Sequence, residues 1–183
     1  MTTMDRILMI AGDQRGYITV RQATEAGIPA VELRKLRQRG RLEHPAHGLY
    51  RIAAFPRRPD DGLMQAALWA DGRGVISHES ALALWDLADV NPKKIHVTVP
   101  PPYRPRKRGG ENYTVWARDI DPRDIDYVDG IPTVTPELAI VESAEHGLQH
   151  RFFEQAILTA RNRGLFGRET EARIRRRLQG AHP

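Results

Sequence analysis

Two short helical patterns near the N-terminus, separated by a glycine and a proline, constrain the fold of this chain most strongly. Thr19 and Gln22 have the spacing of a capping box, in which two side chains satisfy backbone groups at a helix start. Gly27 can adopt the left-handed conformation that ends a helix. Pro29 suits a first helical position, where no N–H group is needed. The pattern therefore predicts two helices joined by a tight turn, the second running from Pro29 to about Gln38.

The second of these helices separates into an apolar face and a basic face. At about 100° per residue, Pro29, Leu33 and Leu36 fall together and are expected to be buried. Residues at the spacing i, i+3, i+4 and i+7 gather on the opposite face, and these are Val31, Arg34, Lys35 and Gln38. Arginine and lysine can pair with guanine in the DNA major groove, and glutamine with adenine. The alternative is a solvated basic face, which is common on surface helices.

A predicted hairpin follows the basic helix directly. Leu42–His44 and Leu49–Ile52 have strand character on either side of the turn Pro45–Gly48, and Tyr17–Thr19 can add a third strand. A basic helix followed by a hairpin is the order of a winged helix-turn-helix, which places one helix in the major groove. We therefore predict sequence-specific DNA binding by this unit.

The predicted DNA contacts comprise the basic face of the helix, three arginines at or beyond its end, two hairpin residues and the first cap. They are Val31, Arg34, Lys35 and Gln38; Arg37, Arg39 and Arg41; His47 and Arg51; and Thr19. The three arginines suit phosphates, which fix the position on DNA without reading its sequence. His44 and His47 form an HxxH pair, but no third ligand is nearby, so no metal site is predicted.

The net charge of +5 has an uneven distribution along the 183 residues. Residues 1–57 contain ten Lys or Arg and five Asp or Glu, whereas the remaining residues contain eighteen of each. The whole excess of positive charge therefore coincides with the proposed DNA-binding unit, as expected of an electrostatic footprint for nucleic acid.

The composition of Ala54–Asp61 predicts a domain boundary, because proline and charge interrupt the apolar pattern there. We expect a winged helix-turn-helix over residues 1–56, called here the N-terminal unit, and a mixed α+β domain over residues 57–183, called here the body. The predicted helices of the body are Leu63–Ala70, Ser77–Leu87, one beginning at Thr135, and two around Gln149–Arg163 and Glu169–Leu178. Its predicted strands, which form a small sheet, are Ile95–Val99, Tyr113–Trp116 and Ile125–Val128.

Two charged segments of the body are candidate interaction surfaces. The proline-stiffened loop 100–110 carries four basic residues that can contact DNA phosphates or an acidic partner, or form an ordinary solvated loop. These are Arg104, Arg106, Lys107 and Arg108. Residues 117–145 contain eight acidic and two basic residues, a balance that would repel DNA but suit a basic protein partner.

Signals for an enzyme are weak. Ser77, His78 and Glu79 are adjacent at a helix start, where they point in different directions and where capping accounts for the serine. No glycine-rich phosphate loop is present, and the chain contains no cysteine. We predict no catalytic residue, no metal and no cofactor. Without a signal peptide or a long apolar run, we expect a cytoplasmic protein with no membrane contact.

The chain resembles the AbiEi-type antitoxins of bacterial abortive-infection toxin–antitoxin systems. Four segments carry the resemblance: Gly48–Arg51 in the hairpin, and Ile76–Leu82, His96–Pro100 and Gly130–Glu137 in the body. The resemblance implies a protein that binds repeats in its own promoter and represses transcription, and that opposes a co-encoded nucleotidyltransferase-like toxin. The alternative is a stand-alone winged-helix transcriptional regulator without a toxin partner. The oligomeric state stays open.

Overall fold

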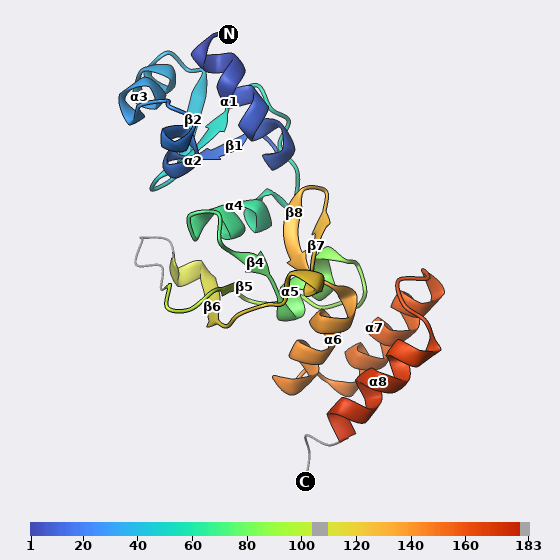
Figure 1. The fold of residues 1–183 in the computed structure, drawn as a ribbon. Helices are drawn as coiled ribbons and strands as arrows, with labels where there is room; N and C mark the ends of the chain where they lie inside the picture. The colour runs from blue at the N-terminus through green and yellow to red at the C-terminus, as the bar shows by residue number, and fades with distance from the viewer. Residues whose placement is uncertain (104–109, 180–183) are drawn as a thin grey trace.

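A three-stranded sheet and a five-stranded sheet, each packed against helices, organise the chain (Figure 1). This computed structural model describes residues 1–103 and 110–179. The prediction of an α+β fold with C-terminal helices is confirmed. Within the described residues, no helix has the length and apolar character that a membrane span requires. The boundary between residues 56 and 57 stays a prediction.

The N-terminal unit has the element order of a winged helix. Its helices are α1 (Thr3–Ala11), the short 3-10 helix η1 (Gly12–Gln14), α2 (Val20–Glu25) and α3 (Ala30–Gln38). Its strands are β1 (Tyr17–Thr19), β2 (Leu42–Ala46) and β3 (Leu49–Ile52), which pair antiparallel in the order β1-β3-β2. The predicted capping box is present, because Thr19 Oγ1 accepts from the N–H of Gln22 and Gln22 Oε1 accepts from the N–H of Thr19.

The position predicted for Pro29 is wrong by one residue. Pro29 is the N-cap of α3, with a ψ of 143°, because its extended backbone completes the tight turn before the helix begins at Ala30. Its side chain is exposed, and Ile28 is fully buried instead. Leu33 is also fully buried, and Leu36 packs against the same core.

The hairpin turn is also tighter than predicted. Strand β2 continues through Pro45 to Ala46, so the turn consists of His47 and Gly48. Pro45 is tolerated because β2 is an edge strand, where a missing N–H breaks no ladder hydrogen bond, and the pairing register shifts between Glu43 and Ala46.

The body is built on the sheet β6-β5-β4-β8-β7. Its strands are β4 (Val75–Ile76), β5 (Ile95–Val99), β6 (Tyr113–Ala117), β7 (Ile125–Val128) and β8 (Ile131–Val134). Its helices are α4 (Asp61–Trp69), α5 (His78–Leu84), α6 (Pro136–Glu145), α7 (His150–Asn162) and α8 (Arg168–Gln179), with the 3-10 turns η2 (Gly110–Asn112) and η3 (Pro122–Asp124). Helices α7 and α8 lie at the end of the molecule furthest from α3 (Figure 1).

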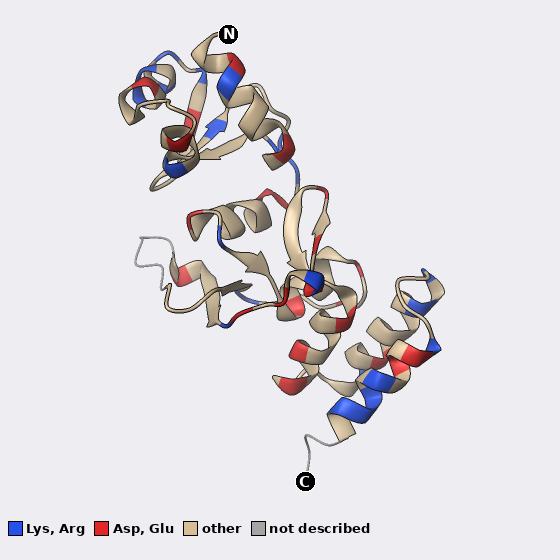
Figure 2. Ribbon diagram, in the orientation of Figure 1, with Lys and Arg blue, Asp and Glu red and all other residues tan. Residues whose placement is uncertain are grey.

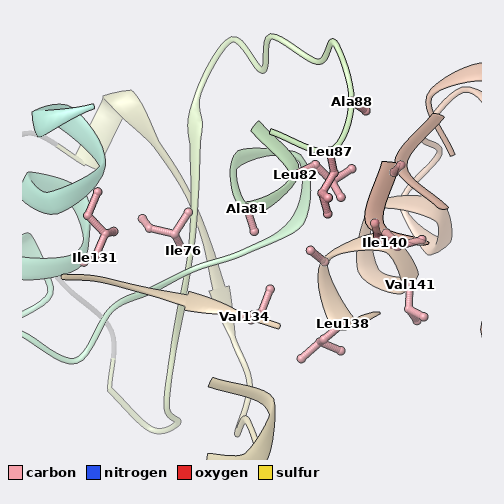
Figure 3. Packing of buried hydrophobic residues seen from close by; sticks show 14 of the residues in the cluster. Ile76, Ala81, Leu82, Leu87, Ala88, Ile131, Val134, Leu138, Ile140 and Val141 are labelled. Atoms are coloured by element: carbon pink, nitrogen blue, oxygen red, sulfur yellow. The ribbon is translucent and has the colours of Figure 1, made fainter. Parts of the chain in front are cut away.

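Two large hydrophobic clusters stabilise the chain, and the cluster of the body also includes Tyr17 and Leu49 of the N-terminal unit. Ile7, Ile18, Leu33 and Ile52 are among the buried residues of the cluster that holds the N-terminal unit together. The cluster of the body joins strands β4 and β8 to helices α5 and α6, whose apolar side chains face one another (Figure 3). Burying each large aliphatic side chain contributes about 1.5–3 kcal/mol. The helices of both parts are therefore fixed by packing.

Polar contacts cross the junction between the N-terminal unit and the body, beside the apolar packing of Tyr17 and Leu49 in the cluster of the body. Arg15, just before β1, is buried and donates two hydrogen bonds to the carboxylate of Asp60, one of them 2.9 Å long. Arg15 Nε also donates to the carbonyl of Asp129 in the β7–β8 turn, at 3.1 Å. Tyr17 Oη accepts from Gln65 in α4 at 3.0 Å. These contacts fix the position of the N-terminal unit on the body.

The acidic surface predicted over residues 117–145 is largely neutralised within the chain. Its glutamates pair with arginines from distant positions: Glu137 with Arg173, Glu145 with Arg177 and buried Glu142 with Arg118. Asp121 pairs with Arg123, and Asp129 lies within 3.6 Å of Arg15. The composition of the segment overestimates its free negative charge, because most of these partners come from outside it.

Candidate nucleic-acid interface

Helix α3 presents one face to the core and the other to solvent. Leu33 is fully buried, whereas Arg34, Lys35 and Gln38 are exposed and Val31 is 47% exposed. An acidic residue in the first turn of α3 and basic residues in its last turn stabilise the helix dipole. Val31, Arg34, Lys35 and Gln38 therefore share an exposed face, as their spacing in the sequence predicts.

The positive charge on this face is available to a ligand. Lys35 Nζ lies 2.8 Å from Glu32 Oε1, one turn back. Such an exposed pair contributes only about 0.2–1 kcal/mol, so an incoming phosphate or base can replace it at little cost. Within residues 1–103 and 110–179, no carboxylate forms an ion pair with the four arginines of this region, which are Arg34, Arg37, Arg39 and Arg41.

The wing hairpin follows α3, and its strand β2 packs against that helix. His47 is exposed at the tip of the turn, and the ring of His44 lies 4.8 Å from that of Tyr50. The pKa of His44 is lowered, mainly by burial and further by the positive charges of Arg37 and His47. Arg37, His44 and His47 are therefore electrostatic neighbours. In the part of the chain that the structure describes, no group of three or more His, Cys, Asp or Glu residues could hold a metal ion.

Two residues predicted to contact DNA are buried, which is a correction to the sequence analysis. Thr19 is 2% exposed and its hydroxyl caps α2. Arg51 is 1% exposed because β3 is the central strand of its sheet. Its Nη2 donates to the carbonyls of Phe55 and Pro56, both at 2.8 Å. Arg51 therefore anchors the segment that leads into the body and does not face a ligand.

Four further predicted contacts, Arg104, Arg106, Lys107 and Arg108, lie outside the described residues. Tyr103, directly before them, is described and half-buried. Arg21 of α2 and Arg73 after α4 are also exposed, and no pattern in the sequence predicts either of them as a contact. The residues around each of them do not indicate a DNA contact, because an isolated exposed arginine is typical of any protein surface.

The structure also gathers a polar cluster inside the body. His78 has a left-handed backbone (φ 53°), and its Nδ1 lies 3.0 Å from Ser77 Oγ and 3.6 Å from Glu142 Oε2. Ser77 occupies the N-cap position of α5, but its side chain does not cap the helix. Instead, Ser77 Oγ accepts a hydrogen bond from Thr98 Oγ1 at 2.8 Å.

This cluster lacks the geometry of a catalytic triad. In a triad, one imidazole nitrogen contacts the nucleophile and the other contacts the carboxylate, whereas in this cluster Nδ1 faces both groups. Burial, together with the charges of His146, His96 and Arg118, lowers the pKa of His78 to about 3. A general base at neutral pH works best with a pKa near 7. The cluster instead ties α5 to β5 and α6.

The N-terminal unit matches a known protein family. Residues 5–53 match the family described as "Transcriptional regulator, AbiEi antitoxin". The resemblance to AbiEi-type antitoxins is thereby confirmed for the N-terminal segment, and this is a family of regulators, not of enzymes.

A solved structure gives a second comparison. The crystal structure of the RV2827C protein from Mycobacterium tuberculosis aligns with 79% of this chain, at 19% identity and a TM-score of 0.44. The chain covers 61% of that protein's length. No curated protein matches the chain significantly.

Proposed function

We propose that the chain is a DNA-binding antitoxin that binds repeats in its own promoter and represses transcription in the cytoplasm. The observation that carries this proposal is the exposed face of α3, which presents Arg34, Lys35 and Gln38 to solvent in a helix followed directly by the wing hairpin. These side chains suit base edges, and Arg37, Arg39 and Arg41 suit the flanking phosphates. The family match over residues 5–53 supports the same reading.

The proposal includes opposition to a co-encoded nucleotidyltransferase-like toxin, which rests on the resemblance in the body. One observation favours the alternative of a stand-alone regulator. Arg118, Arg173 and Arg177 neutralise glutamates of the acidic segment, which leaves fewer free carboxylates for a basic partner. Co-expression with the product of the neighbouring gene separates the two: rescue of growth supports the antitoxin, with or without co-purification, and the absence of rescue supports the stand-alone regulator.

A mobility-shift titration on the upstream region of the gene tests DNA binding. Wild-type protein is expected to retard promoter DNA in the presence of excess scrambled competitor. The double variant R34E/K35E is expected to lose this binding, because both charges on the reading face change sign. Its matched control is R168E/R176E, which also reverses two exposed charges, on α8 far from α3. Normal promoter binding by R34E/K35E would refute the assignment of α3 as the reading helix.

A further inference from the structure

One apolar side chain interrupts the polar face of α3. Val31 is 47% exposed, whereas Leu33, the other large aliphatic residue in the first half of the helix, is fully buried. Among the described residues that pack against the hydrophobic cluster of the N-terminal unit, Leu36 of the same helix is present and Val31 is not. Core packing therefore does not account for the valine at this position.

The stability of the helix does not account for Val31 either. A β-branched side chain loses rotamer freedom in a helix and is less favourable there than alanine. Val31 is the second residue of α3, and an acidic side chain in the first turn suits the helix dipole better, as Glu32 does. In the free protein, an exposed valine at this position therefore lowers helix stability without a core contact that offsets the loss.

Val31 lies on the face of α3 that carries the predicted base contacts. Arg34 and Lys35 follow it at i+3 and i+4, and Gln38 follows at i+7, so the four exposed side chains form one row. Residues near the N-terminus of a recognition helix contact base edges in the major groove. Figure 2 shows the basic segments of α3, in blue, at the outer edge of the N-terminal unit. DNA bound along this row meets the methyl groups of the valine as well as the charges.

The major groove contains an apolar group that such a side chain can recognise. Thymine presents its C5-methyl group there, and apolar side chains contact this methyl group. The two γ-methyl groups of a helical valine are held in one strongly preferred rotamer, so little side-chain freedom is lost when they make a contact. Val31 and Gln38 are separated by about 10 Å along the helix axis, which corresponds to about three base-pair steps of DNA.

We propose that Val31 contacts the C5-methyl group of a thymine in the promoter and is a specificity-determining residue of α3. The inference rests on the proposed function, because it names a base that the same helix reads. The neighbouring carboxylate of Glu32 lies 2.8 Å from Lys35 Nζ, so its charge is neutralised beside the contact. The contact adds specificity without adding charge, unlike the contacts of Arg34 and Lys35.

Replacing single thymines of the promoter site with uracil tests this proposal. Uracil lacks only the C5-methyl group and keeps the base pair. Wild-type protein is expected to lose about fourfold in affinity at the contacted thymine, which is equivalent to about 0.8 kcal/mol for one buried methyl group. Val31→Ala removes both γ-methyl groups, so this variant is expected to bind the thymine and uracil duplexes with equal affinity. The losses from the two changes are therefore not additive at this position.

Val115→Ala is the matched control for V31A. Val115 is an exposed valine (39%) in strand β6 of the body. The V115A variant should keep the wild-type preference for thymine over uracil. Neither variant changes a charge, so the salt dependence of promoter binding should equal that of the wild type for both. Urea unfolding checks that both variants are folded.

The outcomes separate this inference from the proposed function. If wild-type protein prefers its promoter over scrambled DNA but binds every uracil-substituted duplex as tightly as the parent, the inference alone is overturned. A thymine preference that V31A retains would also overturn it, because another group then contacts the methyl. Failure of the wild-type protein to prefer its promoter over scrambled DNA would overturn both.

Discussion

Replacing Gly130 with alanine should loosen the junction between the N-terminal unit and the body. Gly130 lies in the β7–β8 turn with φ 80°, and a Cβ atom there would approach the backbone carbonyl oxygen of Asp13 to 2.4 Å. The left-handed conformation costs an alanine roughly 1–2 kcal/mol. Relieving the overlap requires backbone movement, which costs typically about 1–3 kcal/mol more. The movement also stretches the hydrogen bond from Arg15 to Asp129.

Gly147→Ala is the matched control for this variant. Gly147 also has a left-handed backbone (φ 90°), but no atom lies within 4 Å of the added methyl group. Urea unfolding of both variants measures the difference. G130A should lose about 1–3 kcal/mol more free energy of unfolding than G147A, since the conformational cost is shared and only the clash differs. Equal losses would refute the claim that the two parts pack closely at Asp13.

Two further predictions concern Thr19 and His78. Thr19→Ala should cost about 1 kcal/mol in free energy of unfolding through the lost cap and leave the affinity of the folded protein for promoter DNA unchanged. A loss of affinity in the folded variant would restore Thr19 as a contact. The pKa of His78 is about 3 in the folded chain and near 6.5 in the unfolded chain. Between these pH values the imidazole is protonated only in the unfolded chain. The free energy of unfolding therefore falls as the pH drops below 6.5. His78→Asn, which tolerates the left-handed backbone, should remove up to about 1.4 kcal/mol per pH unit from the slope of stability between pH 5 and 6. An unchanged slope in urea unfolding at several pH values would contradict the buried, neutral state.

Local signals in the sequence predicted the helix-turn-helix well. The capping box at Thr19, the break at Gly27 and the spacing of Leu33 depend on neighbouring residues, and the structure contains all three features. The error at Pro29 also has a local cause, because proline fits both the N-cap and the first helical position. Strand β8 is not among the predicted strands, although Asp129–Gly130 between apolar segments is typical of a two-residue hairpin turn.

Features that depend on tertiary contacts could not be predicted in this way. Arg51 resembles an exposed wing residue until the sheet order makes β3 the central strand. The glutamates at 137 and 145 resemble a free acidic surface until α8 brings Arg173 and Arg177 against them.

The measurement that tests the central claim most directly is a competition titration of wild type and R34A with promoter and scrambled DNA. If Arg34 reads a base edge, its loss removes about 1–3 kcal/mol of discrimination, and the promoter-to-scrambled affinity ratio falls by roughly 5- to 150-fold. An equal loss of affinity for both DNAs, with the ratio unchanged, would mean that α3 only grips phosphates. That result would contradict sequence-specific reading by this helix.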